Sequence, residues 1–173
     1  PLTFYEFIHL KNLGALIKPD AINWKGNIAV FSSTTNIVEL NKHFVNYVNF
    51  GGYPEVIFNR EIQDNPGRFL RADIVDKVLL RDLPGLYGIQ DVQELNALFT
   101  TIAWNSGREC SLDELSKGSG VKKLTLRQYL SYLEAAFLIH IVKRVDQKGV
   151  RFQRENFFKM YLTNPSLRSA LFA

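Results

Sequence analysis

The clearest hydrophobic pattern in the chain lies between residues 92 and 106. Four apolar side chains recur there at helical spacing: Leu95, Leu98, Phe99 and Ile102. They would form one apolar stripe along an α-helix, and Gly107 is well placed to end that helix. A shorter second helix is predicted to begin with the capping box of Ser111 and Glu114 and to end at the glycines 118 and 120.

A third helix is predicted to begin at Thr125, with Gln128 in the capping-box position. Its stripe of apolar positions is Leu126, Leu130, Leu133 and Phe137. Residues 139–145 alternate and are β-branched, so they favour a strand, and residues 157–162 can return as a second strand after a turn at Gly149. This order is typical of a winged helix-turn-helix. The alternative is three helices and a hairpin packed without that geometry.

The first half of the chain is predicted to form a separate, all-helical unit. Thr3 and Glu6 form a capping box for a helix that runs to about residue 11. Asn36 and Glu39 cap a second helix, which ends at residues 51–52. The apolar stripe of this second helix is Ile37, Leu40, Phe44 and Tyr47.

Between and after these two helices the pattern is weaker. Residues 13–35 read as a loop in which residues 28–31 can form a short strand. Asn65 and Pro66 are predicted to start another helix that runs to about Leu83. A break at Pro84, Gly85 and Gly88 would then separate the two halves. The predicted fold class is therefore mainly α with a small β wing.

Composition narrows the class of protein. The 173 residues are 46% hydrophobic and 22% charged, which is ordinary for one or two globular domains. No apolar run approaches the ~20 residues that a membrane span needs, and no signal-peptide layout is present. The single cysteine, Cys110, fits a reducing cytoplasm. A chain that opens with Pro1 suggests a piece excised from a longer protein, or a trimmed tag.

The positive charge is concentrated in the second half. Residues 1–92 hold 9 Lys and Arg against 10 Asp and Glu, whereas residues 93–173 hold 12 against 7, a net charge of +5. Basic residues on the third helix and the wing are where a winged helix meets DNA phosphates. The alternative is that they are solvated surface charges. The residues concerned are Lys122, Lys123, Arg127, Lys143, Arg144, Lys148, Arg151 and Arg154.

Other chemistry is poorly supported by the residue spacing. His9, His43 and His140 are far apart, and none pairs with Cys110 at metal-ligand spacing, so no zinc site is expected. No Ser-His-Asp grouping has supporting context, and most aromatic residues fall on helix stripes, which favours a core. Trp24, in the predicted loop, is the exposed aromatic residue expected to contact a partner.

Four collinear phrases resemble one known family. They are PLTFYEF at residues 1–7, GGYPEV at 51–56, DKVLLRDL at 76–83, and YLSYLEAAFLI followed by KMYLTNPSLRSALF at 129–139 and 159–172. They are similar to the AAA-type P-loop ATPases of archaea and bacteria. In that family a nucleotide-binding core precedes a helical lid, a winged helix and a C-terminal domain that resembles restriction endonucleases.

The resemblance implies a domain organisation and a division of chemistry. Residues 1–88 would be the helical lid-like domain, 89–163 the winged helix-turn-helix, and 164–173 the start of a truncated C-terminal domain. The phosphate-binding G-x-x-x-x-G-K-[ST] motif is absent from the sequence, so this chain would be no enzyme and hold no cofactor. ATP and Mg²⁺ would belong to the parent protein's core. Thr163 and Asn164 stand where many relatives carry an Asp, which argues against a nuclease role.

The same resemblance assigns three polar residues to the nucleotide site. Glu55 ends the lid motif at residues 51–55, and Arg60 follows it. Arg81, at the end of the helix before the winged helix, would reach a phosphate or a neighbouring subunit. Each has a structural alternative. The paired glycines and Pro54 can simply end a helix, and Arg81 can match a local carboxylate or the C-terminal helix dipole.

Two functions follow from these observations. The first is a non-catalytic part of an ATPase that couples the nucleotide state to double-stranded DNA. The second is a winged helix that serves protein–protein contact or homo-oligomerisation through the apolar run at residues 136–142. The expected partners are DNA, the chain's own ATPase core and C-terminal domain, and a second copy, with no membrane contact.

Overall fold

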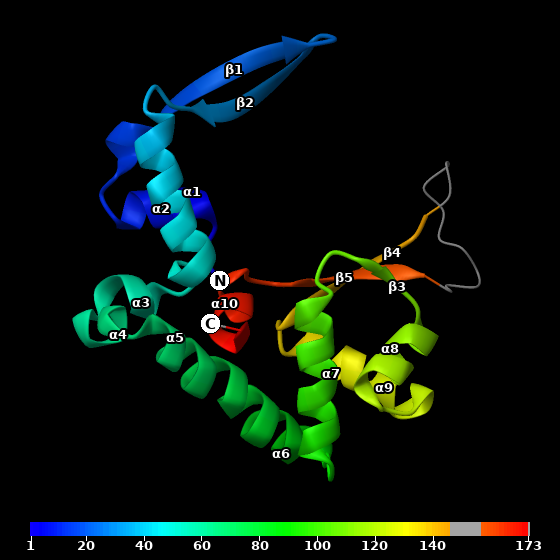
Figure 1. The fold of residues 1–173 in the computed structure, drawn as a ribbon. Helices are drawn as coiled ribbons and strands as arrows, with labels where there is room; N and C mark the ends of the chain where they lie inside the picture. Colours follow the sequence, from blue (N-terminus) through cyan, green and yellow to red (C-terminus); the bar gives the residue numbers. More distant parts are fainter. Residues whose placement is uncertain (146–156, 173) are drawn as a thin grey trace. The chain divides into compact units, whose positions relative to one another are not determined.

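The computed structural model describes residues 1–145 and 157–172 (Figure 1). The chain divides into two compact units, Pro1–Pro66 and Gly67–Ala173. The described residues are mainly helical, with one antiparallel sheet of two strands and another of three. The predicted class, mainly α with a small β wing, is confirmed.

The first unit is built around a short helix with a complete cap. Helix α1 (Phe4–Leu10) begins at Thr3, and the Thr3 backbone N–H donates to the Glu6 carboxylate over 2.7 Å. The capping box predicted from the sequence is therefore confirmed. The next element is a single 3-10 turn, η1 (Gly14–Leu16). Phe7 and Ile8 of α1 are buried and form the core of this unit together with Ile57.

The segment predicted to be a loop forms a hairpin. Strand β1 (Lys18–Trp24) pairs with β2 (Asn27–Ser33) along their whole lengths. Lys25 and Gly26 both have positive φ, 50° and 82°, the backbone that a tight two-residue hairpin turn requires. Within the described part of the chain, neither face of the hairpin is covered: Trp24 is 66% exposed and Val30 75%. The expectation of an all-helical first half, with at most a short strand at residues 28–31, was wrong.

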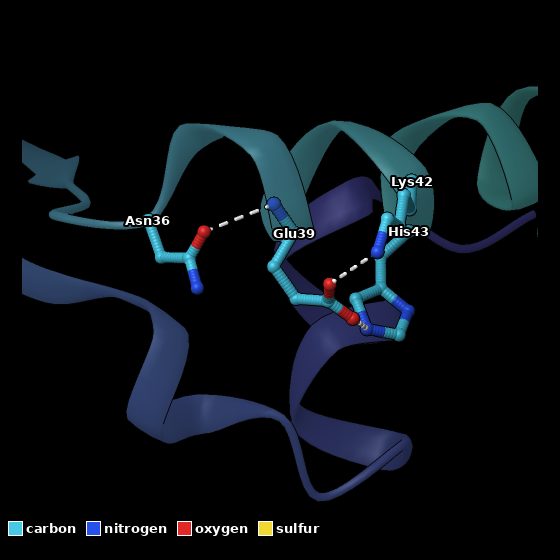
Figure 2. Close-up of polar contacts among 4 residues, drawn as sticks. All are labelled: Asn36, Glu39, Lys42 and His43. Atoms are coloured by element: carbon cyan, nitrogen blue, oxygen red, sulfur yellow. Dashed lines mark hydrogen bonds and ion pairs between the residues drawn. The ribbon is translucent and has the colours of Figure 1, made fainter.

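Three helices complete the first unit. Helix α2 (Ile37–Phe50) begins at Asn36, whose side chain accepts the N–H of Glu39 over 3.1 Å, as predicted (Figure 2). It ends at Gly51, also as predicted. Helices α3 (Pro54–Phe58) and α4 (Arg60–Asp64) follow. Of the predicted stripe on α2, Leu40 and Tyr47 pack on the core, whereas Ile37 and Phe44 stay more than 40% exposed.

A long helical stretch opens the second unit. It contains α5 (Pro66–Phe69), the π-helical segments η2 (Leu70–Asp76) and η3 (Val78–Asp82), and α6 (Leu83–Tyr87). The predicted break at Pro84 and Gly85 was wrong. Pro84 lies in the first turn of α6, where its missing N–H costs little, and the helix ends at Gly88 in a left-handed conformation.

This stretch packs with the second unit. Its residues Leu70, Val75, Leu79 and Leu83 are at most 2% exposed. Segment η2 contacts helix α10 (Ser166–Phe172), and η3 contacts helix α7 (Val92–Trp104). The compact units therefore divide near residue 66, whereas the sequence placed a boundary at residue 88. Buried leucines and valines on the helix account for the difference.

The rest of the second unit follows the predicted order of elements. After α7 come β3 (Glu109–Cys110), α8 (Leu112–Ser119), α9 (Lys123–Ala135), β4 (Ile139–Lys143) and β5 (Phe158–Leu162). The sheet order is β3-β5-β4, all antiparallel. The capping box of Ser111 and Glu114 is present as predicted. Strand β3 was not predicted, because two residues are too few to show a periodic pattern.

Helix α9 differs from its prediction at both ends. It begins at Lys123, with Lys122 as the N-cap and no side-chain cap, so the predicted start at Thr125 was wrong. Leu126, Leu130 and Leu133 are buried as the pattern predicted. Phe137 lies beyond the end of the helix, has a φ of 55° and is 76% exposed. It therefore does not belong to the apolar stripe.

The last helix of the described chain is preceded by a side-chain cap. The Ser166 N–H donates to Asn164 Oδ1 over 2.8 Å, and helix α10 follows. Both residues are almost completely buried. Helix α10 contacts η2 and α7, so it packs within the second unit. In this structure residues 164–172 are therefore a part of that unit.

Candidate nucleic-acid interface

The first basic group lies on the first two turns of α9. Lys122 is the N-cap residue of that helix, and Lys123 and Arg127 are four residues apart, which places them on one face. All three side chains are exposed, while Leu126 beside them is fully buried. Burial of the apolar stripe on one side of α9 thus turns these cations toward solvent.

One of these cations already has a partner. Lys123 Nζ forms an ion pair with Asp113 of α8, and this hydrogen bond lowers the pKa of the Asp113 carboxyl. Both side chains are more than half exposed, so the pair is screened by salt and contributes little to stability. A phosphate group can therefore compete for Lys123. The sequence prediction missed this ion pair because it joins two helices.

The second basic group lies at the wing. Lys143 is the last residue of β4 and Arg144 follows it, and both are exposed. Lys159 on β5, which the sequence prediction did not single out, is exposed and pairs across the sheet with Val142 and with Glu109. Three further predicted contacts lie outside the described residues: Lys148, Arg151 and Arg154.

The first basic group lies at the start of α9, and the second lies at the end of β4, the strand that begins four residues after α9 ends. The 13 residues of α9 span about 20 Å, with Lys123 in the first turn. At the other end, Glu134 Oε1 accepts the N–H of Ile141 on β4 over 3.1 Å and lies 3.9 Å from His140 Nδ1. Glu134 and the Glu109 carboxylate keep the surface from being uniformly positive.

The three residues predicted at a nucleotide site belong to different units. Glu55 lies in the first turn of α3 and Arg60 is the first residue of α4, both exposed in the first unit. Arg81 is exposed near the end of η3 in the second unit. Their assignment to a nucleotide site stays a prediction.

Cysteine and histidine chemistry finds little support in the described part of the chain. Cys110 is buried, and its thiol donates to the Phe158 carbonyl over 3.5 Å. Burial, reinforced by the charges of Glu114 and Glu109, raises the pKa of the Cys110 thiol to about 11, so it stays protonated at neutral pH. The residues that the structure describes contain no cluster of three or more potential metal ligands.

The exposed tryptophans and the helix lengths complete the description. Trp24 is exposed as expected, but on a strand, and Trp104 is also 60% exposed. The Trp104 ring packs edge-on against Phe172, and the Arg168 guanidinium lies 5.7 Å from its centre. Among the helices of residues 1–145 and 157–172, none combines the length and the apolar character that crossing a bilayer requires.

Comparison with known proteins places the chain beside uncharacterized relatives. A family model described as a domain of unknown function (DUF8612) matches residues 41–173. An uncharacterized protein of Haemophilus influenzae is 25% identical over 174 residues, covering 97% of this chain and 37% of the relative. One of Methanocaldococcus jannaschii is 22% identical over 153 residues, covering 86% and 31%. This chain thus spans about a third of either relative. No solved structure gives a significant match.

Proposed function

The chain belongs to the family of this domain of unknown function (DUF8612), and we propose that its second unit is a winged-helix module that binds duplex DNA. We propose further that the whole chain is the lid and winged-helix part of a P-loop ATPase. The observation that carries the DNA proposal is the row of exposed cations at the start of α9, on a helix whose opposite face is buried.

The order of elements supports the winged-helix assignment. Three helices, α7, α8 and α9, are followed by the strands β4 and β5, with β3 between the first two helices. In a helix-turn-helix the second helix of the pair enters the major groove, and here that helix is α9. A wing beside it reaches the neighbouring phosphates. Lys122, Lys123 and Arg127 would then contact the DNA from α9, and Lys143 and Arg144 from the wing.

The ATPase proposal rests on the four phrases that resemble the AAA-type family. The P-loop that would bind ATP and Mg²⁺ is absent from this sequence, so nucleotide hydrolysis belongs to another part of the parent protein. The relatives leave room for such a part, because this chain spans only about a third of each. Glu55, Arg60 and Arg81 are the residues proposed to meet the nucleotide-binding core. The proposal places the protein in the cytoplasm.

The DNA proposal is tested by measuring how duplex affinity depends on salt. Fluorescence anisotropy with a labelled duplex should show a Kd that rises steeply between about 50 and 200 mM salt. Each phosphate contact contributes roughly 0.9 to the slope of log Kd against log salt. Replacing Lys122, Lys123 and Arg127 together with Ala should therefore lower that slope by about 3 and weaken binding at low salt.

A matched control separates specific contacts from net charge. Lys18, Lys25 and Lys77 are exposed and lie outside the α9–wing surface, so replacing all three with Ala removes the same charge. That control should bind DNA nearly as the original chain does. Equal losses for the two triple variants would refute the assignment of the site to α9. No binding of the original chain at about 50 mM salt would refute DNA binding altogether.

The Lys123–Asp113 ion pair gives a test of opposite sign. Asp113→Asn removes a negative charge and releases the Lys123 ammonium, so DNA affinity should rise. Glu61→Asn removes an exposed carboxylate from α4 in the first unit and should leave the affinity nearly unchanged. Unchanged binding by Asp113→Asn would mean that Lys123 does not contact the phosphates.

A second function, self-association through this unit, is favoured by one observation. Phe137 is 76% exposed although its backbone has a φ of 55°, which is unfavourable for a bulky residue. The helix end accounts for this left-handed backbone, because the Leu138 N–H donates to the Leu133 carbonyl over 3.0 Å and closes α9. The exposed aromatic ring of Phe137 is the feature that favours a contact. Leu138 and Ile139 are buried within the unit, so the apolar run at residues 136–142 is exposed only in part.

Sedimentation velocity tests this alternative. If Phe137 contacts a second copy, the 173-residue chain should form a dimer at micromolar concentration, and Phe137→Asn should restore the monomer. Asn tolerates the left-handed conformation, so this substitution should not unfold the chain. A chain that stays monomeric across the concentration range would eliminate the alternative without affecting the DNA proposal.

A further inference from the structure

The first unit contains a cavity of ligand size. Its volume is about 360 Å³, within the range of small-molecule sites, and its walls come from α1, α2, α3 and α4 and from the turns between them. The whole lining lies within residues 1–66, so the cavity belongs to one compact unit. None of its lining residues belongs to α9 or the wing.

The floor of the cavity is apolar and well fixed. Phe7, Val56 and Ile57 line it and are at most 7% exposed. Gly51 also lines it, and an added Cβ there would lie 2.8 Å from the Phe7 ring, so the glycine lets that ring pack directly on the backbone. Such a floor would bury an aromatic or aliphatic group and gain free energy from removing that group from water.

Four polar side chains share the lining of the cavity: Lys11, His43, Asn46 and Gln63. Lys11 is the C-cap residue of α1, and its exposed ammonium is the one Lys or Arg group in the lining. Asn46, an exposed residue on α2, adds an amide. Gln63 is anchored because its amide N–H donates to the Ile57 carbonyl over 2.5 Å. These groups can recognise an anion next to the apolar floor.

His43 is held in place from outside the cavity. Figure 2 shows Glu39 reaching both Lys42 and His43, and His43 Nε2 lies 3.4 Å from Glu39 Oε1. Lys42 Nζ donates to Glu39 Oε2 over 2.9 Å, and this contact lowers the pKa of the Glu39 carboxyl. The Glu39 charge is thus compensated by Lys42. The described residues that line the cavity include Lys11 and no Asp or Glu, so the lining itself favours an anion.

We propose that this cavity binds a small amphipathic anion: a carboxylate or phosphate carried on an aromatic or aliphatic body, with the anion at Lys11 and Asn46 and the body on Phe7, Val56 and Ile57. The proposal is independent of DNA binding by the second unit. It assigns the first unit a ligand of its own.

Isothermal titration of the 173-residue chain tests the proposal with three probes of one body size. Benzoate and phenyl phosphate carry the anion, and benzyl alcohol does not. Either anion should bind saturably at millimolar concentration or tighter, and the alcohol more weakly. The stronger of the two anions identifies the head group. Saturable binding of neither anion would overturn the proposal.

Variants locate the binding. Lys11→Met should weaken anion binding about tenfold, in line with the loss of one charge-assisted hydrogen bond, and leave the alcohol unchanged. Lys25→Met removes an equivalent exposed lysine from the hairpin turn and should change nothing. Asn46→Trp places a large side chain on the exposed rim and should block all three probes. Equal affinities for Lys11→Met and Lys25→Met would overturn the assignment.

A structural readout excludes binding elsewhere. In amide ¹H–¹⁵N spectra, the anions should shift the resonances of Gly51, Val56 and Ile57, while those of α7 and α9 stay fixed. Shifts confined to the second unit would refute the cavity as the site. Thermal unfolding of each variant without ligand shows whether a lost titration signal reflects lost folding. If a variant has lost its fold, the amide spectra of the original chain still show whether the anions bind at the cavity.

Discussion

Replacing Gly51 with Ala probes how tightly the first unit is packed. An ideal Cβ at Gly51 would lie 2.6 Å from the Tyr47 Cα and 2.8 Å from two carbons of the Phe7 ring. Both distances are below contact range, and the nearest atom is backbone, which cannot rotate away. Phe7 is 3% exposed at the centre of the core, and the Tyr47 hydroxyl donates to the Leu2 carbonyl over 2.8 Å.

The magnitude follows from two opposing effects. Overpacking a well-packed site costs about 1–3 kcal/mol. Gly51 has a φ of −83°, which alanine adopts without strain, so the substitution also gains up to about 1 kcal/mol by restricting the unfolded chain. Because the clash is the larger effect, Gly51→Ala should destabilise the unit by about 1–2 kcal/mol. The population of its unfolded form would then rise roughly tenfold.

Urea denaturation followed by residue-specific amide resonances measures this effect for each unit. Phe7 reports on the first unit and Leu98 on the second, which matters because two units need not unfold together. Gly67→Ala is the matched control: Gly67 lies in α5 with open space around it, so alanine should stabilise that helix by about 1 kcal/mol or less. A Gly51→Ala chain as stable as the original would refute the packing argument.

Three further predictions concern other parts of the fold. Ser111→Ala removes the N-cap of α8 and should lower the free energy of unfolding, measured in urea titrations, by about 1 kcal/mol. Ser131→Ala, at an exposed position on α9, is the control and should leave that free energy nearly unchanged. Burial raises the pKa of the Cys110 thiol from 9.0 to about 11. The stability that the buried thiol contributes is therefore fully present below pH 9 and is lost as the pH rises through 11. Cys110→Ala should remove this part of the loss of stability at alkaline pH. In hydrogen-exchange mass spectrometry, the amides of residues 18–33 should exchange with solvent far faster than those of α7. Equal protection of the two segments would mean that the hairpin is covered in solution.

Local signals made much of the fold predictable. The capping boxes at Thr3 and Ser111 and the cap at Asn36 all mark the true starts of helices. These caps need only residues within three positions of each other, so one sequence contains the whole signal. The apolar stripe of α7 was equally clear, because each of its four predicted positions is fully buried.

Non-local structure was not predictable in the same way. The β1–β2 hairpin carries apolar residues on both faces and so shows no simple alternation of buried and exposed positions. Strand β3 exists only because Glu109 and Cys110 pair with β5, nearly fifty residues later. The helical stretch through Pro84 continues because its buried side chains pack on α7 and α10, and because Pro84 falls in the first turn of α6, where a missing N–H costs little.

The candidate interface also combines features that the sequence predicts with features that it does not. Sequence placed Lys122, Lys123 and Arg127 on one helix, and the structure places all three there with exposed side chains. Whether they bind DNA stays a prediction. Two other features depend on how helices and strands pack together: the ion pair of Lys123 with Asp113, and the position of Lys159 on the open face of the sheet. Such contacts leave no pattern within a single helix or strand.

The two strands of the hairpin differ in how they would behave at high protein concentration. Among the described residues each has one strand beside it, so its other edge presents a row of main-chain groups to other molecules. Strand β1 carries Lys18, Pro19 and Asp20, residues that discourage addition of another strand. Strand β2 reads NIAVFSS, without charge or proline, a composition prone to intermolecular sheet formation. If the protein aggregates, growth should therefore begin along β2, and a lysine at Val30 would delay it.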